Sequence, residues 1–598
     1  MGMRDPAIPL YFYAFILYAT FMKTLQNQLK NLFTEASLKA FPELEGSDFP
    51  VEVLQSTQQK FGDYQYNSAM KMAKQLGKPP REIGQRIIDH IDCGTLIESL
   101  ELAGPGFVNI HLKAEALDNF TNAIAGDAHL AVDKPHGDHR ILVEFSSPNT
   151  AKELHVGHLR STIIGDCLAR LFEFLGYDVL RLNHIGDWGT QFGMLIAHMK
   201  EEAPYVLTGE QHTDLSHLVG WYKESKKRFD DDIDFKKRAQ NEVVALQSGN
   251  ETSLAAWKIL CAISREAYQE IYDLLDIKIT ERGESFYNPM LEAVVDDLDA
   301  KGLITISHGA KCIFLEGFKN RDGDPLPLMV QKSDGGYNYD TTDMAAMKQR
   351  AEEEGVERII IVTDAGQAIH FQMIEQASVK AGYLDPQKVQ FDHVTFGVVL
   401  GPDGKKFKTR SGETERLIDL ISTAIEKAGE ILKERSPEMD EQERKELARA
   451  LGIGAIKYAD LSCNRSGDYT FSYDRMLRFE GNTAAYLMYS YVRVAGIKRK
   501  IGIDQIKGSI ILEHPTERAL GLHLAQFGEA LEQVSKDLLP NRLTDYLYAL
   551  AEKFNAFYRD CPVEGSEQQS SRLLLCETVA RVMKQGLEIL GVKTVERM

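Results

Sequence analysis

Residues 140–185 contain the pattern that most restricts how this chain can fold. The run "ILVEFS" (141–146) is apolar apart from Glu144 and its last residue, Ser146, which is typical of a strand buried in a parallel sheet. "HLRSTIIGDCLARLFEFLG" (158–176) has apolar residues at helical spacing and stops at a Gly, and "YDVLRLNHI" (177–185) is typical of a second strand. A strand, a helix and a strand in this order form a βαβ unit. We therefore predict an α/β, doubly wound, Rossmann-like domain.

Segments of different character follow one another along the 598 residues, which are enough for several domains. We predict an N-terminal α/β domain over 22–133, the sheet domain over 134–414 and an all-α C-terminal domain over 415–598. A charge-rich, helical stretch at about 201–325 is expected to be an insertion in the sheet domain. Its run "KKRFDDDIDFKKR" indicates a solvated helical face rather than a binding patch.

The first 21 residues differ from the rest. Ile8–Phe21 is an apolar run shorter than the ~20 residues of a membrane span, and no small-residue cleavage site precedes Met22. We expect residues 1–21 to be an extension from an upstream start codon, with Met22 as the native start, which the intact mass of the cellular protein would test. Seven cysteines without a C-x-x-C pair disfavour a disulfide framework and favour a reducing, cytoplasmic location with no membrane association.

The stretch "SSPNTAKELHVGHLRST" lies where the first predicted strand turns into its helix. Ligands of open α/β sheets bind at the carboxyl ends of the strands, and a helix N-terminus attracts phosphate. His155, His158 and Lys152 would add donors and positive charge there. A metal site is disfavoured because H-x-x-H lacks further ligands, and no G-x-G-x-x-G or P-loop motif occurs in the stretch. Solvent-exposed histidines at a helix start remain the simplest alternative.

"HVGH" resembles the HIGH signature of class I aminoacyl-tRNA synthetases, and together with "GDWGTQFG" the stretch resembles the arginyl-tRNA synthetase family. The resemblance runs from about Met22 to Met598 and includes "FGDYQYNSAM", "AGPGFVNI" and "GESFYNPM". It implies that arginine attacks the α-phosphate of ATP, releasing pyrophosphate, and that the arginyl group then passes to the 3′ end of tRNA(Arg). It also implies that activation requires bound tRNA.

The resemblance assigns residues to ATP. His155, Gly157 and His158 would bind it, with Lys405 and Lys406 from the loop "GPDGKKFKTRSGE"; Lys406 and Lys408 would act in catalysis together with the histidines. This loop departs from the family's KMSKS signature, because Thr409 stands where the second Lys belongs. Many arginyl enzymes share this loss and carry a Lys before the HIGH motif, which is Lys152 here. The alternative interpretation of Lys152 is a solvated loop residue with no role in catalysis.

The resemblance also assigns an arginine pocket. Glu144 and Asp343 match positions that bind the guanidinium, which pairs well with carboxylates. Asn149 and Gln367 match positions that contact the amino acid's backbone groups, and Tyr339 lines the pocket. For Glu144 the alternative is an ion pair with a protein Arg or Lys; for Asp343 it is a carboxylate at a helix N-terminus. Gln372, five residues on, competes with Gln367.

Transfer RNA is the implied partner, although a net charge of −19 by itself argues against nucleic-acid binding. Exposed charges are screened beyond about 10 Å, so a local basic surface is still possible. Tyr486, Tyr489 and Arg493 share one helix face and could stack on bases, although an aromatic core stripe is an equal alternative for either Tyr. Tyr64, Gln65 and Asn67 lie in the part that resembles the tRNA-elbow module.

We expect ATP to act with Mg²⁺, no zinc, and a monomer. Two other functions remain open: a nucleotidyltransferase that adenylylates a small molecule, and a non-catalytic RNA-binding relative. The helical C-terminal segment disfavours the first, and the presence of the His pair, the carboxylates and the lysine loop disfavours the second. Pyrophosphate exchange with arginine, with and without tRNA, would discriminate between them.

Overall fold

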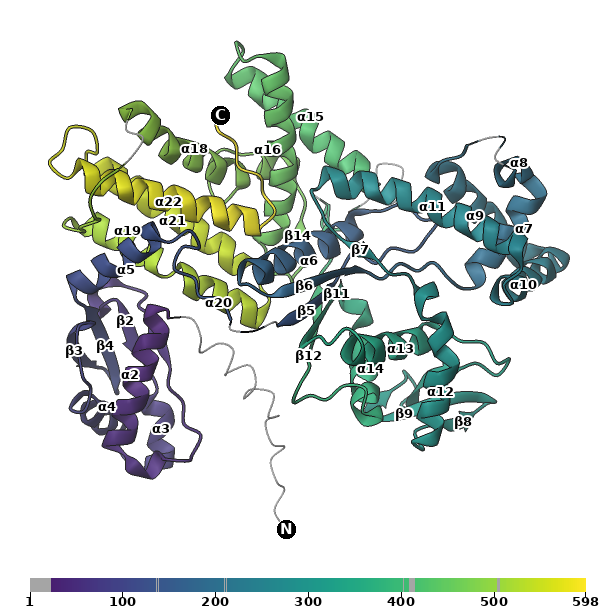
Figure 1. Cartoon of the computed structure of the whole chain (residues 1–598), viewed down its shortest axis with the longest axis horizontal. Helices are drawn as coiled ribbons and strands as arrows, with labels where there is room; N and C mark the ends of the chain where they lie inside the picture. Colours follow the sequence, from purple (N-terminus) through teal and green to yellow (C-terminus); the bar gives the residue numbers. More distant parts are fainter. Residues whose placement is uncertain are drawn as a thin grey trace. The chain divides into compact units, whose positions relative to one another are not determined.

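The structure, a computed structural model, describes residues 23–135, 137, 139–208, 210, 212–401, 403–407, 415–502 and 506–598. The expected extension 1–21 and Lys408 lie outside these residues. The chain divides into two compact units (Figure 1). The first consists of Gly137–Arg478 and Ile589–Val592; the second of the described residues before 137, Phe479–Glu588 and Lys593–Met598. Among the described helices, none has both the length and the apolar character needed to cross a bilayer.

A five-stranded parallel sheet organises the first unit. Its strand order is β12-β11-β5-β6-β7, so the chain winds one way from β5 and the other way from β11. The strands are β5 (Arg140–Glu144), β6 (Asp178–Asn183), β7 (Thr280–Glu281), β11 (Arg358–Asp364) and β12 (Gln390–Phe396). All four neighbouring pairs are parallel. The predicted doubly wound α/β fold is confirmed.

Helices cover both faces of this sheet (Figure 1). On one face lies α6 (Val156–Phe174), the predicted crossover from β5 to β6, whose Ser161 hydroxyl donates to the carbonyl of Val362 on β11 at 2.6 Å. On the other face α13 (Tyr339–Glu352) and α14 (Ala368–Ala381) share a buried apolar cluster with β5, β6 and β11. Because apolar side chains meet it from both sides, β5 is buried along almost its whole length, as its sequence predicts.

The expected insertion at 201–325 is two insertions in the structure, because β7 returns to the sheet between them. The first is helical: α7 (Thr190–Glu202), α8 (Pro204–Leu207), α9 (Leu215–Asp231), α10 (Ile233–Gln247) and α11 (Glu251–Leu274). The second contains η3 (Glu284–Met290), α12 (Leu291–Ala300) and an antiparallel sheet of β8 (Thr305–Ser307), β9 (Ala310–Lys319) and β10 (Pro325–Gln331). A two-residue strand is too short to give a periodic signal, so the sequence could not indicate it.

The first unit also extends past the predicted boundary at 414. It includes α15 (Leu417–Arg435), α16 (Glu441–Leu461) and α17 (Tyr473–Met476), and a small parallel pair of β13 (Val399–Leu400) with β14 (Tyr469–Thr470). These helices belong to the first unit because a buried ion pair joins α6 to α16: the side chains of Arg160 and Asp460 are 1% and 0% exposed.

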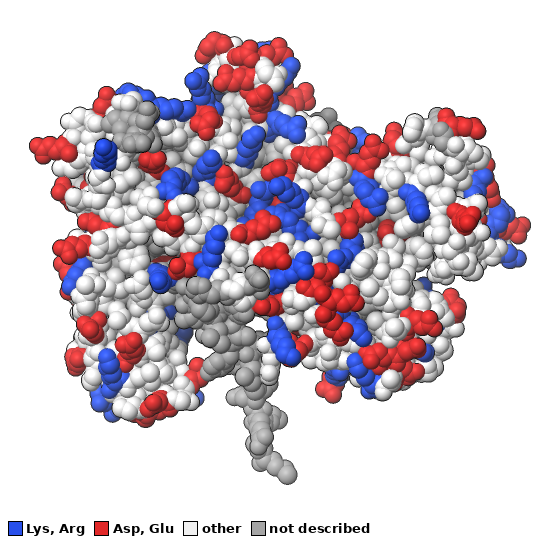
Figure 2. Space-filling view, viewed as in Figure 1, with Lys and Arg blue, Asp and Glu red and all other residues white. Residues whose placement is uncertain are grey.

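On the face drawn in Figure 2, acidic residues gather at the exposed end of the α15–α16 hairpin.

The second unit combines both ends of the chain. An antiparallel sheet in the order β1-β2-β4-β3 packs with N-terminal helices. Its elements are α2 (Leu25–Ala40), η1 (Pro42–Leu44), β1 (Val53–Gln55), η2 (Gln59–Phe61), β2 (Tyr64–Tyr66), α3 (Ala69–Leu76), α4 (Pro80–Ile88), β3 (Ile97–Ala103), β4 (Phe107–Leu112) and α5 (Ala114–Gly126). The C-terminal helices are α18 (Ala484–Ile501), α19 (Pro515–Ala525), α20 (Phe527–Asp537), α21 (Asn541–Asp560) and α22 (Gln569–Ile589).

Candidate active site

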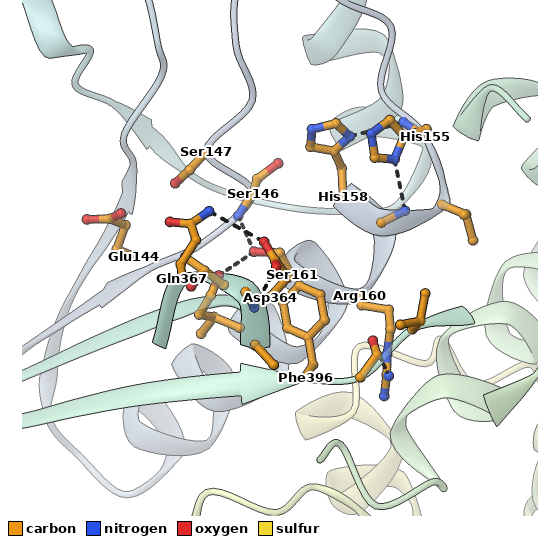
Figure 3. A pocket seen from close by; sticks show the side chains of 18 of the residues that line it. Glu144, Ser146, Ser147, His155, His158, Arg160, Ser161, Asp364, Gln367 and Phe396 are labelled. Carbon is orange, nitrogen blue, oxygen red and sulfur yellow. Dashed lines mark hydrogen bonds between the residues drawn. The ribbon is translucent and has the colours of Figure 1, made fainter. Parts of the chain in front are cut away.

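A cavity of about 1220 Å³ lies at the carboxyl ends of β5 and β11, the strands between which the winding direction changes. Such a switch point is where open α/β sheets bind ligands. The predicted residues in its wall are Glu144, Asn149, His155, Gly157, His158, Tyr339, Asp343, Gln367 and Lys406. Figure 3 shows the two histidines at one side of the cavity and Glu144 and Gln367 at another. The cavity therefore has a histidine side and an acidic side.

The histidine side is built on the first turn of α6. His155 is the N-cap residue, and its Nδ1 accepts a hydrogen bond from the backbone N–H of Gly157 at 3.1 Å. Nδ1 of His158 accepts from the backbone N–H of His155, also at 3.1 Å. A ring nitrogen that accepts carries no proton, so a neutral imidazole here is protonated on Nε2. Both rings are therefore held with an Nε2–H donor available.

These histidines are neutral, which corrects the expectation that they bring positive charge. Burial and then the nearby charge of Lys152 lower the pKa of His155, while burial, His155 and Lys152 lower the pKa of His158 to about 3. Gly157 is needed for this arrangement, because a Cβ there would lie 2.9 Å from Cε1 of His155. Any side chain at this position would displace the ring that caps the helix.

On the acidic side, Glu144 is already paired. Its Oε2 lies 2.5 Å from Nη2 of Arg350 on α13, and the two side chains are 6% and 2% exposed. Arg350 Nη2 also lies 3.3 Å from Nδ1 of His184. The alternative for Glu144, a strand carboxylate paired with a protein guanidinium, is therefore present. Because Glu144 also lies in the cavity wall, its contact with arginine stays a prediction.

Asp343, in the second turn of α13, faces two histidines. Its Oδ2 accepts a hydrogen bond from Nε2 of His370 at 2.6 Å, and its Oδ1 lies 4.0 Å from Nε2 of His184. Burial alone would raise the pKa of Asp343, but the His370 hydrogen bond and the charges of His370, His184 and Arg350 outweigh it and lower the pKa. Asp343 is therefore ionised.

Glu284 is a wall residue to which the sequence assigned no role. It is the first residue of η3 and stands in "GESFYNPM", a segment whose family resemblance assigns no residue role. Burial and then the negative charges of Asp343 and Asp187 raise the pKa of Glu284 to about 8. A carboxyl group among other carboxylates in a cavity is suited to a cationic ligand, because the cation removes the repulsion.

The remaining predicted pocket residues lie at the edges of this region. The carbonyl of Asn149 accepts from the Tyr268 hydroxyl at 2.8 Å, which fixes its loop beside the cavity. Tyr339, the first residue of α13, is 61% exposed, and its ring meets that of His370 edge-on at 5.2 Å. Gln367 precedes α14 and lines the cavity, whereas the competing Gln372 is exposed and not in the wall.

The predicted lysines are only partly at the cavity. Lys406 is in the wall, on a turn that starts at β13 and in which Leu400 and Lys406 form an antiparallel bridge. Lys405, next to it, is not in the wall, and Lys408 lies outside the described residues. Lys152 is exposed and also outside the wall; its Nζ stands 5.8 Å from the ring centroid of Tyr222 on α9.

Arg160, in the second turn of α6, is a fully buried wall residue that the sequence did not single out. Its Nε donates to Asp460 at 3.1 Å, and its Nη1 donates to the carbonyls of Gly397 at 2.8 Å and Gly467 at 3.1 Å. It thereby joins the histidine helix to the base of the turn that carries Lys406. No local pattern in the sequence of α6 distinguishes Arg160 from the helix's other charged residues.

In the second unit, Tyr64 cannot stack on RNA, which corrects its assignment. The side chain is 0% exposed, and its hydroxyl donates to Glu529 on α20 at 2.7 Å. Gln65, on the opposite face of the same strand, is half-buried and donates to Asn109 at 2.8 Å. Asn67 is also half-buried, and its Oδ1 has no hydrogen-bond partner within the described ranges.

The predicted face of α18 is partly exposed. Tyr489 is 46% exposed. Tyr486 is half-buried, its hydroxyl donates to Glu552, and it accepts from Asn555 at 2.8 Å. The Arg493 guanidinium lies 4.8 Å from the ring centroid of Tyr558 on α21. One aromatic ring and one stacked guanidinium are therefore presented to solvent.

Three family models match the chain in succession. "Arginyl tRNA synthetase N terminal domain" covers 23–112, "tRNA synthetases class I (R), catalytic domain" covers 119–473, and "DALR anticodon binding domain" covers 487–598. The second match runs past residue 414, as the sheet unit does.

Curated relatives and solved structures agree with these matches. The chain is similar to an arginine–tRNA ligase from Protochlamydia amoebophila, with 62% identity over 96% of this chain and 100% of the relative. The fold is similar to that of an arginyl-tRNA synthetase from Plasmodium falciparum, with a TM-score of 0.85, 35% identity, and coverage of 96% of this chain and 100% of that one. It is also similar to that of the Thermus thermophilus arginyl-tRNA synthetase, with a TM-score of 0.78, 24% identity, and coverage of 96% and 100%.

Proposed function

Because the chain belongs to the arginyl-tRNA synthetase family, we propose how its residues share the family's reaction. The protein is an arginine–tRNA ligase: it activates arginine with ATP and transfers it to tRNA. The observation that carries the residue assignment is that one cavity at the β5–β11 switch point has neutral histidine donors on one side and carboxylates on the other. Adenylate formation needs both substrates in one such cavity.

Asp343 and Glu284 bind the guanidinium in this proposal. Asp343 is ionised, and no cation among the described residues pairs with Glu284, so the two are the acceptors that a cationic side chain would satisfy. Glu144 contributes through Arg350, whose charge it neutralises. An uncharged analogue such as citrulline would leave carboxylates unpaired in the cavity, which is costly. Asn149, Gln367 and Tyr339, at the rim, hold the backbone groups and the side chain's stem.

ATP binds on the histidine side. His155 and His158 donate from Nε2 to the phosphates, and Gly157 lets the ring of His155 stay in its capping position. In-line displacement at phosphorus depends on position and electrostatic stabilisation more than on an acid or base. The Nε2–H groups of His155 and His158 are already oriented by the helix start, so they can stabilise the phosphates without a rearrangement of the side chains.

Cations around the pyrophosphate come from lysines. Lys406, in the wall, approaches the phosphates directly, with Lys405 and Lys408 from the same loop as further donors. Lys152 supplies the charge that the altered KMSKS signature lacks. Its Nζ now stands over the Tyr222 ring, and an exposed cation–π contact of about 0.5–1 kcal/mol is weak enough for the phosphates to displace.

Transfer RNA is bound by the second unit. The match to an anticodon-binding domain supports RNA contacts in the helical part, and Tyr489, Tyr486 and Arg493 are the groups that could stack on unpaired bases. In the N-terminal part, which we propose as the tRNA-elbow module, Gln65 and Asn67 remain candidates because they are not fully buried. Tyr64 instead holds the two parts of this unit together.

Mg²⁺ is proposed as part of the ATP substrate. Across the residues described, no group of His, Cys, Asp or Glu side chains is arranged to hold a metal ion, so the phosphates are its expected ligands. We also propose a monomer, on the family resemblance, and a cytoplasmic location, on the seven unpaired thiols. Light scattering and cell fractionation would test these two points.

The decisive assay is AMP formation that depends on both arginine and tRNA. We expect AMP only when arginine, ATP and tRNA are all present, and pyrophosphate exchange with arginine to require tRNA. Citrulline in place of arginine is the matched control and should give no AMP. AMP formation that is equal with and without arginine would contradict the assignment.

A further inference from the structure

His370 links two carboxylates of the acidic side. It lies in the first turn of α14, and its Nε2 donates to Oδ2 of Asp343 at 2.6 Å. Its Nδ1 lies 3.3 Å from Oδ1 of Asp340, one turn earlier on α13. The side chain of His370 is 19% exposed and lines the cavity. One imidazole therefore bridges two aspartates of the same helix.

The far end of this bridge is anchored to the backbone. Oδ2 of Asp340 accepts from the N–H of Met329 on β10 at 3.0 Å, and Asp340 is buried. The Nδ2 of Asn338 lies within 3.4 Å of the same oxygen. A continuous chain of contacts thus runs from the β10 backbone through Asp340 and His370 to Asp343.

The charges along this chain agree with its geometry. Burial would lower the pKa of His370, but the hydrogen bonds and negative charges of Asp340 and Asp343 outweigh it and raise the pKa to about 9. His370 is therefore an imidazolium at neutral pH, with both ring nitrogens donating. A group that is already protonated cannot serve as a general base, which excludes that role for it.

We propose that His370 is a positioning residue that fixes the carboxylate of Asp343 for the guanidinium of arginine. It occupies Oδ2 and so leaves Oδ1, which lies 4.0 Å from Nε2 of His184, as the oxygen for the substrate. The inference rests on the proposed binding of arginine by Asp343. The set Asp340, His370 and Asp343 carries one net negative charge, which matches a single guanidinium. Without the imidazolium, two carboxylates would repel one another and Asp343 would lose its fixed orientation.

Substitutions at His370 separate this role from a general structural one. His370→Leu keeps the volume and removes both donors, and His370→Gln keeps an amide N–H where Nε2 stood. We expect Leu to raise the KM for arginine at least tenfold and Gln to raise it less than threefold. The KM for ATP should stay within twofold in both variants. A structural role would move both constants together.

The matched control is His393→Gln. His393 is also half-buried and packs on Phe371, with its ring centroid 4.7 Å away, but it bonds Thr363 instead of Asp343. Its substitution should leave the KM for arginine within twofold. The assay is AMP formation at saturating tRNA, with the melting temperature of each variant measured alongside. If His370→Leu does not fold, Asp340→Asn, which removes the carboxylate that faces Nδ1 of His370, is expected to raise the KM for arginine at least threefold.

The outcomes are distinct. If the unsubstituted protein forms no arginine-dependent AMP, the proposed function fails. If it is active, the positioning role is overturned by a KM for arginine that stays within twofold in His370→Leu, or by equal increases in the KM values for arginine and ATP. When only Asp340→Asn is available, an unchanged KM for arginine overturns it.

Discussion

Arginine binding should expel a proton from Glu284. In the empty cavity, burial and the charges of Asp343 and Asp187 raise the pKa of Glu284 to about 8, so most molecules carry it protonated at pH 7. A bound guanidinium favours the ionised form, which lowers the pKa. If Glu284 loses its proton when arginine binds, the affinity for arginine rises with pH. The rise ends near the pKa that Glu284 has in the free protein.

The size of the effect follows from that pKa. If only ionised Glu284 binds arginine well, the Kd changes about tenfold for each pH unit well below 8, or roughly fiftyfold between pH 6 and pH 8. At pH 7, binding should release about 0.9 proton. Glu284→Gln should bind at pH 8 about as weakly as the unsubstituted protein does at pH 6, because both have an uncharged group at this position.

Isothermal titration calorimetry with arginine, in buffers of different ionisation enthalpy, measures both the Kd and the number of protons released. Other groups that face the site, His370 among them, and the ligand's own amino group titrate in the variant as well. The difference between the unsubstituted protein and Glu284→Gln therefore isolates Glu284. Glu292→Gln, on the exposed surface of α12, is the control and should keep the full pH slope. A release below about 0.2 proton at pH 7, with parallel pH slopes in protein and variant, would refute the reasoning.

Three further predictions concern other parts of the protein. Lys152→Ala should lower the rate of arginine activation at least tenfold, or by about 1.4 kcal/mol of barrier, and pyrophosphate exchange within twofold of the unsubstituted rate would contradict its role. Tyr489→Ala should raise the KM for tRNA severalfold without changing the KM for arginine, since a stacked base contributes roughly 1–3 kcal/mol. Tyr64→Phe should instead destabilise the second unit by about 1–3 kcal/mol, seen as a lower melting temperature with an unchanged KM for tRNA; the opposite pattern for the two tyrosines would contradict the assignment.

The parts of the site that local sequence determines could be predicted. The strand "ILVEFS" and the helix after it define the βαβ unit, and the sheet edge at which such a unit binds ligands follows from its topology. His155 and His158 are three residues apart at a helix start, so their proximity is a property of one turn. The burial pattern of β2 could also be predicted, because side chains alternate along a strand and so put Tyr64 and Tyr66 on one face and Gln65 on the other.

The charge state of the site could not be predicted from the same information. Glu144 and Arg350 meet because α13 packs on the sheet, and no local pattern links residues so far apart in the chain. The neutrality of the histidines depends on burial, and the raised pKa of Glu284 depends on the folding of η3 beside Asp343. Each of these is a consequence of which groups share one cavity, which only the tertiary structure determines.

The hydrogen bond between Tyr64 and Glu529 joins residues separated by 465 positions. A ribosome that adds about 5–20 residues per second releases Tyr64 roughly 20 to 90 s before Glu529. During that interval the N-terminal sheet lacks the helices that complete its unit, and the sheet unit is synthesised between the two halves. Asn27, Asp63 and Tyr64, which later bond side chains of α19 and α20, therefore lack these partners on the nascent chain. The N-terminal part must wait for the last helices before its buried polar groups are satisfied.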